Sequence, residues 1–222
     1  MTHCLILGAS RGIGLELVRQ YRAEGAQVSA TARDDAGLQR LRDLGAQALP
    51  LDVTDELSCA ALAPALQGSQ FDVVVINAGV YGPRQEPGVT PAQADFDQVM
   101  RTNVLGPMRL LPLLPPVLAP GARVGVMSSR MGSIGSRSNG GAWLYRASKA
   151  AVNSVLKDAS LLMGERAVFV ALHPGWVRTD MGGPGADLDV ARSVADLRAT
   201  LASRTPADQG GFFNHDGQPI PW

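Results

Sequence analysis

Two side chains that could exchange a proton with a substrate, Tyr145 and Lys149, lie four residues apart in the stretch Y-R-A-S-K. The stretch is predicted to be helical, and this spacing places a phenol and an ammonium on one face, one turn apart. At about 4 Å and an effective dielectric constant near 20, their attraction would be worth about 4 kcal/mol. Because about 1.4 kcal/mol corresponds to one pKa unit, the ammonium could bring the pKa of the phenol from about 10 toward neutrality. Such a tyrosine can exchange a proton with an alcohol or a carbonyl group.

A glycine-rich segment, Gly8-Ala9-Ser10-Arg11-Gly12-Ile13-Gly14, joins the first predicted strand to the first predicted helix. Glycines allow a sharp turn and a close approach of the backbone to a pyrophosphate, and the helix N-terminus offers free N–H groups and a favourable dipole. A glycine-rich loop alone is weak support, but at a strand-to-helix junction it predicts a nucleotide site. With this site present, Tyr145 and Lys149 are better explained as chemical groups than as a packed tyrosine beside a solvated lysine.

Alternating strand and helix patterns must position these groups, and they predict a doubly wound α/β fold with a parallel sheet. The strand patterns span residues 3–7, 27–32, 46–51, 72–76, 123–127, 167–172 and 211–214. The helix patterns span residues 12–24, 34–44, 55–66, 92–118, 145–163 and 188–203. Gly25 and Gly45 are expected to cap two helices, and Pro112, Pro115 and Pro116 to end or kink the fourth helix early. No linker divides the chain, so residues 1–222 are predicted to form a single Rossmann-fold domain.

The composition excludes several classes of protein. Twenty basic and twenty acidic residues cancel, which argues against binding to nucleic acid or to a membrane surface. No signal peptide or membrane-spanning segment is evident, so a cytoplasmic location is expected. Cys4 and Cys59 suggest no disulfide framework. The histidines His3, His173 and His215 are scattered, so no metal site is expected.

The chain resembles the short-chain dehydrogenase/reductase family, because four further motifs accompany Tyr145, Lys149 and the glycine loop in the family's order. These are Asn77-Ala78-Gly79 after the fourth strand, Asn103 in the fourth helix, Ser128-Ser129 at the end of the fifth strand, and Pro174-Gly175 after the sixth. The resemblance covers nearly the whole chain. The chain is similar in particular to the C-factor-like and sniffer-like carbonyl reductases, because its segments S-S-R-M-G-S-I, HPGWVRTDMGG and DGQPIPW resemble theirs.

The resemblance implies a catalytic set of Asn103, Ser129, Tyr145 and Lys149. Tyr145 would give a proton to the substrate oxygen as hydride arrives from nicotinamide, and Ser129 would orient that oxygen. Lys149 would favour the phenolate and hold the nicotinamide ribose, and Asn103 would hold a water that joins Lys149 to solvent. The resemblance also implies a set of cofactor-binding residues. They are Gly8, Ser10, Arg11, Gly12, Ile13 and Gly14 at the phosphates; Asp52, Val53, Asn77, Ala78 and Gly79 at the adenosine; Tyr145 and Lys149 at the ribose; and Pro174, Gly175, Val177 and Thr179 at the nicotinamide.

The choice of cofactor depends on the end of the second strand. An NAD site places an acidic residue there to bind the ribose 2′-hydroxyl, whereas this chain has Ala32 followed by Arg33. Arg33 and Arg11 could clamp a 2′-phosphate, although Asp34 and Asp35 would weaken the local positive field. We therefore expect NADP(H) to be preferred, with NAD(H) possible.

The chain departs from the family pattern at three places. Leu7 stands where the family usually has Thr, and Ile76-Asn77 where it has two asparagines. Ser129 and Tyr145 are about three positions further apart than is common, and the extra residues fall in 136–142. Lost structural hydrogen bonds and a local rearrangement are the expected consequences.

A short Gly-rich loop at about 175–189 is expected beside the substrate, which is predicted to be a small carbonyl or alcohol. Candidate lining residues are Tyr81, Met131, Trp143, Trp176, Met181 and Trp222, although loop packing explains each about as well. Small residues of the fifth helix, Ala147, Ala150, Ala151 and Ala159, would permit a homodimer. Two alternatives remain: a catalytically silent nucleotide-binding signalling protein, and an epimerase or dehydratase of the family's extended branch, for which the chain is short.

Overall fold

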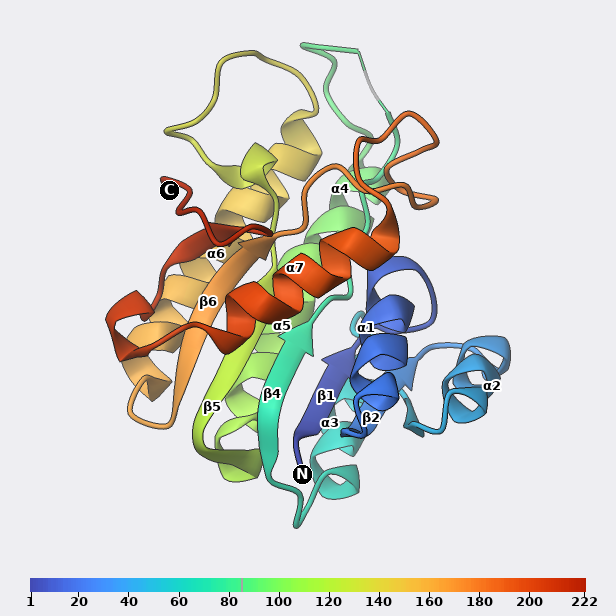
Figure 1. Cartoon of the computed structure of the whole chain (residues 1–222). Coiled ribbons are helices and arrows are strands. Elements are labelled where there is room, and N and C mark those ends of the chain that lie inside the picture. Colours follow the sequence, from blue (N-terminus) through green and yellow to red (C-terminus); the bar gives the residue numbers. More distant parts are fainter. Residues whose placement is uncertain (85) are drawn as a thin grey trace.

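A seven-stranded parallel sheet forms the centre of the computed structural model, which describes residues 1–84 and 86–222 (Figure 1). The strands are β1 (His3–Leu7), β2 (Gln27–Ala32), β3 (Gln47–Pro50), β4 (Phe71–Ile76), β5 (Leu118–Met127), β6 (Ala167–His173) and β7 (Phe212–Asn214). Their order across the sheet is β3-β2-β1-β4-β5-β6-β7. The first three strands are therefore added toward one edge of the sheet and the last four toward the other, so the strand order reverses between β1 and β4. In this architecture, ligands bind in the crevice beyond the carboxyl ends of the strands at such a switch point.

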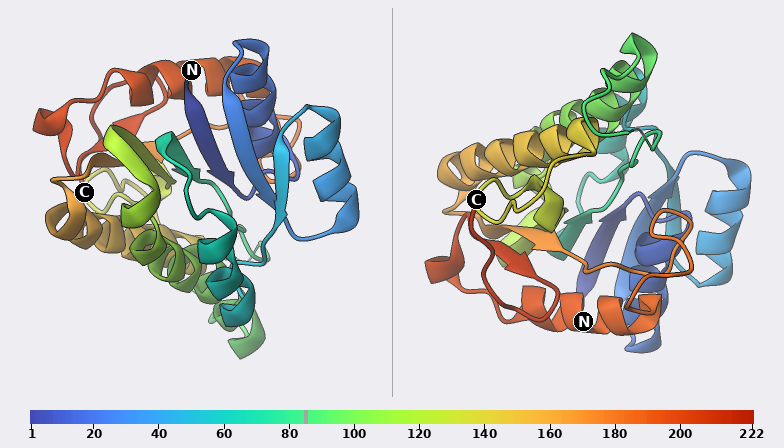
Figure 2. Two further views of the ribbon diagram at one scale, coloured as in Figure 1. Left: turned by 90° about the horizontal axis from the view of Figure 1, so that it is seen from below. Right: turned by 90° about the horizontal axis from the view of Figure 1, so that it is seen from above.

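Helices cover both faces of the sheet (Figure 2). The helices are α1 (Gly12–Ala23), α2 (Asp35–Asp43), α3 (Glu56–Ala65), α4 (Gln93–Met100), α5 (Gly106–Leu110), α6 (Trp143–Met163) and α7 (Val190–Ala202). Side chains alternate along each strand, so that Cys4 and Ile6 of β1 join one apolar core with α1, α2 and α7. Leu5 and Leu7 join a second core with α3, α5 and α6. This is the doubly wound, single-domain α/β fold that the sequence predicted.

The predicted helix at 92–118 is wrong in its extent. The structure has α4, a π-helical segment at Arg101–Leu105, the short α5, and two 3₁₀ turns at Leu111–Leu113 and Pro115–Val117. The prolines Pro112, Pro115 and Pro116 fall in these turns, because a proline removes a helical hydrogen bond and clashes with the preceding turn. β5 then begins at Leu118, five residues before the predicted start.

The predicted glycine caps are confirmed. Gly25 and Gly45 follow α1 and α2 with φ of +80° and +74°, the left-handed conformation that only glycine adopts at little cost. The N–H of Gly25 donates to Arg22, and that of the following Ala26 donates to Tyr21. Within the described ranges, none of the helices combines the length and apolar character needed to cross a membrane.

Candidate active site

The glycine loop turns sharply between β1 and α1 and leaves its backbone accessible. Gly8 has φ of +91°, and a Cβ there would lie 2.7 Å from Ala78. A Cβ on Gly14 would lie 2.3 Å from the carbonyl oxygen of Gly8. Asn77 fixes the same carbonyl by a hydrogen bond of 2.6 Å from its Nδ2. The loop therefore requires glycine at both positions, and Asn77, one of the motif residues, holds it in place.

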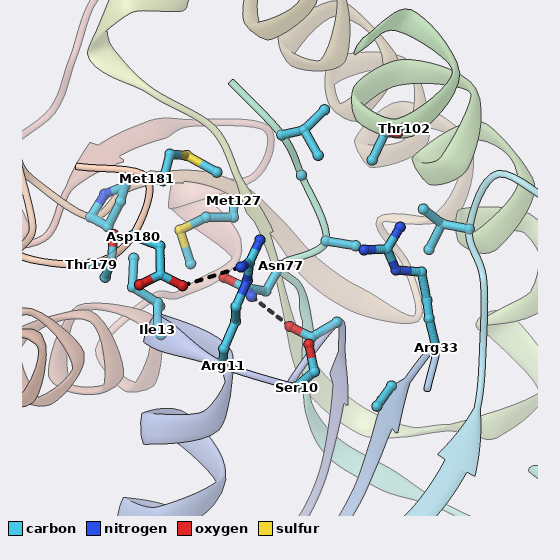
Figure 3. Close-up of a pocket in the computed structure, with 18 of the residues that line it drawn as sticks. Ser10, Arg11, Ile13, Arg33, Asn77, Thr102, Met127, Thr179, Asp180 and Met181 are labelled. Atoms are coloured by element: carbon cyan, nitrogen blue, oxygen red, sulfur yellow. Dashed lines mark hydrogen bonds and ion pairs between the residues drawn. The ribbon is translucent and has the colours of Figure 1, made fainter. Parts of the chain in front are cut away.

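The first turn of α1 has N–H groups to offer to a ligand. An α-helix leaves its first N–H groups without intrahelical partners. Arg11, at the N-cap, makes no capping hydrogen bond through its side chain with any part of the chain that the structure describes. Ser10, Arg11 and Ile13, at the start of this helix, line the cleft (Figure 3), and the positive end of a helix dipole attracts an anion. The chemistry of the loop fits a pyrophosphate.

A cleft of about 370 Å³ opens at the carboxyl ends of β1, β2, β4 and β5. Fifteen of the predicted residues line it: Gly8, Ser10, Arg11, Gly12, Ile13, Arg33, Asp52, Val53, Asn77, Ala78, Gly79, Tyr145, Lys149, Pro174 and Thr179. Gly14, Asn103, Ser129, Gly175 and Val177 lie outside this lining. Val177 is buried and pairs with Leu188 in an isolated bridge, so it supports the wall.

Sequence reasoning missed several lining residues. They are Thr31, Leu51, Thr54, Val80, Thr102, Met127, Ser128, Arg178, Asp180 and Val190. Thr31, Met127 and Ser128 could have been found, because each lies at the carboxyl end of a predicted strand or directly after it, where a parallel sheet places its ligand. Asp180 had no such signal, since its place depends on the path of a loop.

The arginines differ in what they contact. Arg33 lines the cleft just after β2. Burial raises the pKa of Asp52, but hydrogen bonds from Thr54, together with the charge of Arg33, hold it below its ordinary value. Arg11 instead pairs with Asp180 across the cleft, at 3.1 Å (Figure 3). Both partners of this pair are more than two-thirds exposed, so the pair is worth at most about 1 kcal/mol and can be exchanged for another anion.

Asp34, the residue directly after Arg33, is engaged elsewhere. The carboxylate of Asp34 caps α2 by accepting a hydrogen bond of 2.6 Å from the N–H of Gly37. Ala32, at the end of β2, offers no carboxylate to a ribose hydroxyl. This end of the cleft therefore fits a dinucleotide that carries a 2′-phosphate better than one that carries a free 2′-hydroxyl.

Tyr145 and Lys149 lie on α6 at the other end of the cleft, and both are nearly buried. Burial raises the pKa of Tyr145 to about 12, a hydrogen bond with Ser129 lowers it, and Tyr81 raises it. Burial lowers the pKa of Lys149 to about 8. The Nζ of Lys149 donates to the carbonyl of Met127 at 2.9 Å and lies 5.8 Å from the centre of the Tyr145 ring.

The expected lowering of the Tyr145 pKa by Lys149 is wrong for this structure. The lowering was expected for a separation of about 4 Å at an effective dielectric constant near 20. The phenol is instead desolvated, which favours its neutral form, and the ammonium is bound to a carbonyl of β5. Tyr145 therefore keeps its proton at neutral pH.

The three neighbouring serines have different partners. Ser129 precedes a 3₁₀ turn at Arg130–Gly132, which it caps, and it is the serine that meets Tyr145. Ser128 donates to Asn153 at 2.5 Å, and Ser133 donates to the carbonyl of Pro221.

Asn103 lies in the π-helical segment, a feature that is often found at functional sites. Its Oδ1 accepts from the N–H of Val80 and its Nδ2 donates to the carbonyl of Val80, both at 2.8 Å. The same Nδ2 lies 3.0 Å from Ser148 Oγ, which donates to the carbonyl of Tyr145. Asn103 thus ties the loop after β4 to the helix that carries Tyr145. The predicted water at Asn103 stays a prediction.

The predicted substrate-side residues are placed around the cleft mouth and beyond it. Met181 lines the cleft, and Trp143, Trp176 and Met181 are about half exposed. Trp222 instead stacks on Phe212, with ring centres 5.5 Å apart.

Comparison with known proteins identifies the relatives of this chain. A family model described as "Enoyl-(Acyl carrier protein) reductase" matches residues 8–211. C-signal of Myxococcus xanthus is 42% identical over 154 residues, which cover 68% of this chain and 92% of that protein. The carbonyl reductase Sniffer of D. melanogaster superimposes with a TM-score of 0.90 at 30% identity, over 100% of both chains. A carbonyl reductase from Pseudomonas aeruginosa PAO1 in complex with NADP superimposes with a TM-score of 0.89 at 35% identity, again over 100% of both chains.

Proposed function

The chain belongs to the short-chain dehydrogenase/reductase family, and from this premise we propose that it reduces carbonyl groups with NADPH, using Tyr145 as proton donor. It is an NADP(H)-dependent oxidoreductase, and the family and its NADP-bound relatives do not support the silent alternative. The observation that carries the assignment of Tyr145 is its position in the cleft, with the Lys149 Nζ 5.8 Å from its ring centre and Ser129 among the groups that shift its pKa. A protein that only binds nucleotides has no need of this group.

The chain's residues divide the work of the reduction. NADPH, when bound, supplies the hydride to the carbonyl carbon. Tyr145 is neutral at physiological pH because its pKa is raised to about 12, so its proton is available for the substrate oxygen. The Ser129 hydroxyl holds that oxygen, and the Lys149 ammonium, which persists below pH of about 8, stabilises the phenolate that remains.

The cofactor residues are assigned from the same cleft. The glycine loop and the first turn of α1 hold the pyrophosphate, and Arg33 holds the 2′-phosphate. Lys149 also binds the nicotinamide ribose. Pro174 and Thr179, which line the opposite wall, contact the nicotinamide.

The segment 175–189 is proposed to cover the substrate. Its base is fixed by the hydrogen bond from the N–H of Arg178 to Leu188, at 2.8 Å. Trp176 donates from its indole to the carbonyl of Gly182 at 2.9 Å, and Met181 lines the cleft. A loop this short leaves an open site, which suits small-molecule carbonyls of varied size.

The test is NADPH consumption by the purified protein with a panel of aldehydes, ketones and quinones. Wild type should consume NADPH with some of them, and Tyr145→Phe should bind NADPH as tightly while turnover falls by roughly 10²–10⁴-fold. Unchanged turnover in Tyr145→Phe would refute the proposed donor. Tight binding without turnover by wild type on the whole panel would argue against a carbonyl reductase.

A homodimer through the π-helical segment, α5 and α6 is proposed from their exposed apolar side chains, Leu105, Met108, Leu161 and Leu162. Ala147 is exposed, whereas Ala159 is buried in its own subunit's core, so only part of the predicted small-residue surface is available. Light scattering that finds only a monomer at tens of micromolar would refute the dimer. A cytoplasmic location is proposed because Cys4 and Cys59 are free thiols, as is usual there, and cell fractionation tests it.

A further inference from the structure

The ring of Tyr81 stacks on the ring of Tyr145, with centres 4.5 Å apart and planes 30° from parallel. We propose that Tyr81 is a positioning residue that fixes the plane of the Tyr145 ring in the orientation needed for proton donation. The proposal rests on the proposed function, because it takes Tyr145 as the proton donor. It concerns a contact within the protein and assigns Tyr81 no contact with the substrate.

The ring plane matters because of the geometry of a phenol. The torsion that turns a tyrosine ring is soft, and the hydroxyl oxygen lies on the axis of that rotation. The oxygen therefore stays in place when the ring turns, so a neighbour that meets only the hydroxyl, as Ser129 would, leaves the ring free to turn. A phenolic O–H prefers the plane of its ring, so the ring plane sets the direction in which the proton points. A stacked neighbour fixes that plane.

Tyr81 is itself held in place on its N-terminal side. The adjacent Val80 has both its N–H and its carbonyl bound to the side chain of Asn103, each at 2.8 Å. Asn103 also reaches Ser148 on the helix that carries Tyr145. The same amide thus fixes Tyr81 and the Tyr145 helix relative to each other.

Tyr81 is also held on its C-terminal side. Gly82 turns the chain with φ of +80°, and a Cβ there would lie 2.7 Å from a methyl group of Val99. The guanidinium of Arg84 lies 5.9 Å from the centre of the Tyr81 ring, within range of a cation–π interaction. The ring is thus fixed by its own loop and can act as a support.

Tyr145 lies in the first turn of α6, and hydrogen bonds already hold the backbone of this turn. Arg146 donates from its Nε to the carbonyl of Gly141 at 3.0 Å, and Ser148 donates to the carbonyl of Tyr145 at 2.8 Å. These bonds restrain the backbone and leave the ring torsion of Tyr145 free. The stacked ring of Tyr81 restrains that torsion.

The test compares Tyr81→Phe, which keeps the ring, with Tyr81→Leu, which removes it. In Tyr81→Phe, kcat should stay within about twofold of wild type. In Tyr81→Leu, kcat should fall by roughly 10- to 100-fold, because a misplaced reacting group costs about that much. The Kd of NADPH and the KM of the carbonyl should be unchanged in both. The solvent deuterium isotope effect on kcat should rise in Tyr81→Leu alone, because proton transfer becomes slower.

Tyr21→Leu is the matched control. Tyr21 lies near the C-terminal end of α1, away from the glycine loop. Like Tyr81, it packs against an arginine: the guanidinium carbon of Arg198 lies 4.4 Å from the centre of the Tyr21 ring. This variant should lose stability without a change in kcat per folded molecule or in the isotope effect. A general loss of packing is thereby separated from the loss of the stack.

Three outcomes would overturn the proposal. They are an unchanged kcat in Tyr81→Leu, a change confined to the KM of the carbonyl, and an equal loss in Tyr81→Phe, which would assign the effect to the hydroxyl. Tyr145→Phe is measured in parallel. If it retains turnover, the proposed function itself fails; if it is inactive while Tyr81→Leu matches wild type, only the role of Tyr81 fails.

Discussion

Lys149 donates from its Nζ to the carbonyl of Met127, the last residue of β5, at 2.9 Å. The bond links α6 to the carboxyl end of β5, where Met127 lines the cleft. It also holds a buried ammonium whose pKa is lowered by burial alone. The position of Lys149 is thus set by the sheet, and its contact with Tyr145 is at the longer range of 5.8 Å from the ring centre.

Lys149→Met should keep the length of the side chain while removing its charge and its donor. We expect kcat for carbonyl reduction to fall by roughly 10²–10⁴-fold, because the phenolate formed after proton transfer loses its stabilising charge. The Kd of NADPH should also rise, since Lys149 is assigned to the ribose. Steady-state kinetics and fluorescence titration measure both, and circular dichroism confirms folding. A folded Lys149→Met with wild-type kcat would contradict this role.

The pH dependence of carbonyl reduction should follow the titration of Lys149. Reduction needs the phenol of Tyr145 protonated and Lys149 charged, and their pKa values of about 12 and about 8 make both true below pH of about 8. As pH rises through about 8, Lys149 loses its proton first, so kcat should decline. Lys149→Arg keeps its charge throughout this range, so whatever activity it retains should show no such decline. A wild-type rate that stays level well above pH 8 would contradict the assignment.

The preference for NADPH should depend on Arg33. Arg33→Ala should raise the KM of NADPH by roughly 10- to 100-fold, because a charge-assisted bond to phosphate is worth about 1.5–3 kcal/mol. The KM of NADH should change little. The variant Ala32→Asp supplies the missing acidic residue. It should lower the KM of NADH and raise that of NADPH, because the carboxylate binds the ribose 2′-hydroxyl and repels the 2′-phosphate. An equal rise in the KM of NADPH and of NADH in Arg33→Ala would show that Arg33 has only a structural role.

Gly14→Ala should abolish tight cofactor binding, since its Cβ would lie 2.3 Å from the carbonyl of Gly8 and displace the loop. Gly25→Ala is the matched control, because that glycine has φ of +80° and open space around it. The control should lose about 1 kcal/mol of unfolding free energy, from backbone strain alone, and still bind NADPH. Urea denaturation and NADPH titration distinguish the two. Unaltered binding in Gly14→Ala would contradict the assigned phosphate site.

Local patterns predicted the order of the elements, and the resemblance to the family implied most of the cleft. The strand at Gln27–Ala32 was predicted to the residue, because apolar runs and flanking glycines are local signals. The helix at 92–118 was wrong, because apolar periodicity does not distinguish an α turn from a π or 3₁₀ turn. The effect of Lys149 on the pKa of Tyr145 was also wrong, because desolvation depends on tertiary packing.

Contacts between distant loops had no signal in the sequence. The Arg11–Asp180 pair joins residues 169 positions apart, and the stack of Tyr81 on Tyr145 joins the loop after β4 to α6. Each depends on the paths of loops that fold against the sheet. The motifs shared with the family therefore predicted most of the residues that line the cleft and missed how they contact one another.

The π-helical segment at Arg101–Leu105 makes the length of this part of the chain as significant as its composition. A π turn accommodates about one residue more than an α turn, and each residue advances an α-helix by about 100°. Deleting one residue here would relax the segment to a regular α-helix and rotate all that follows. Asn103 lies within the segment and bonds Val80, whereas Gly106 follows the segment, at a place where a Cβ would lie 3.1 Å from Val53. Single-residue deletions here should therefore be far less tolerated than substitutions. The directions in which Asn103 and Gly106 point depend on the number of residues in this one turn.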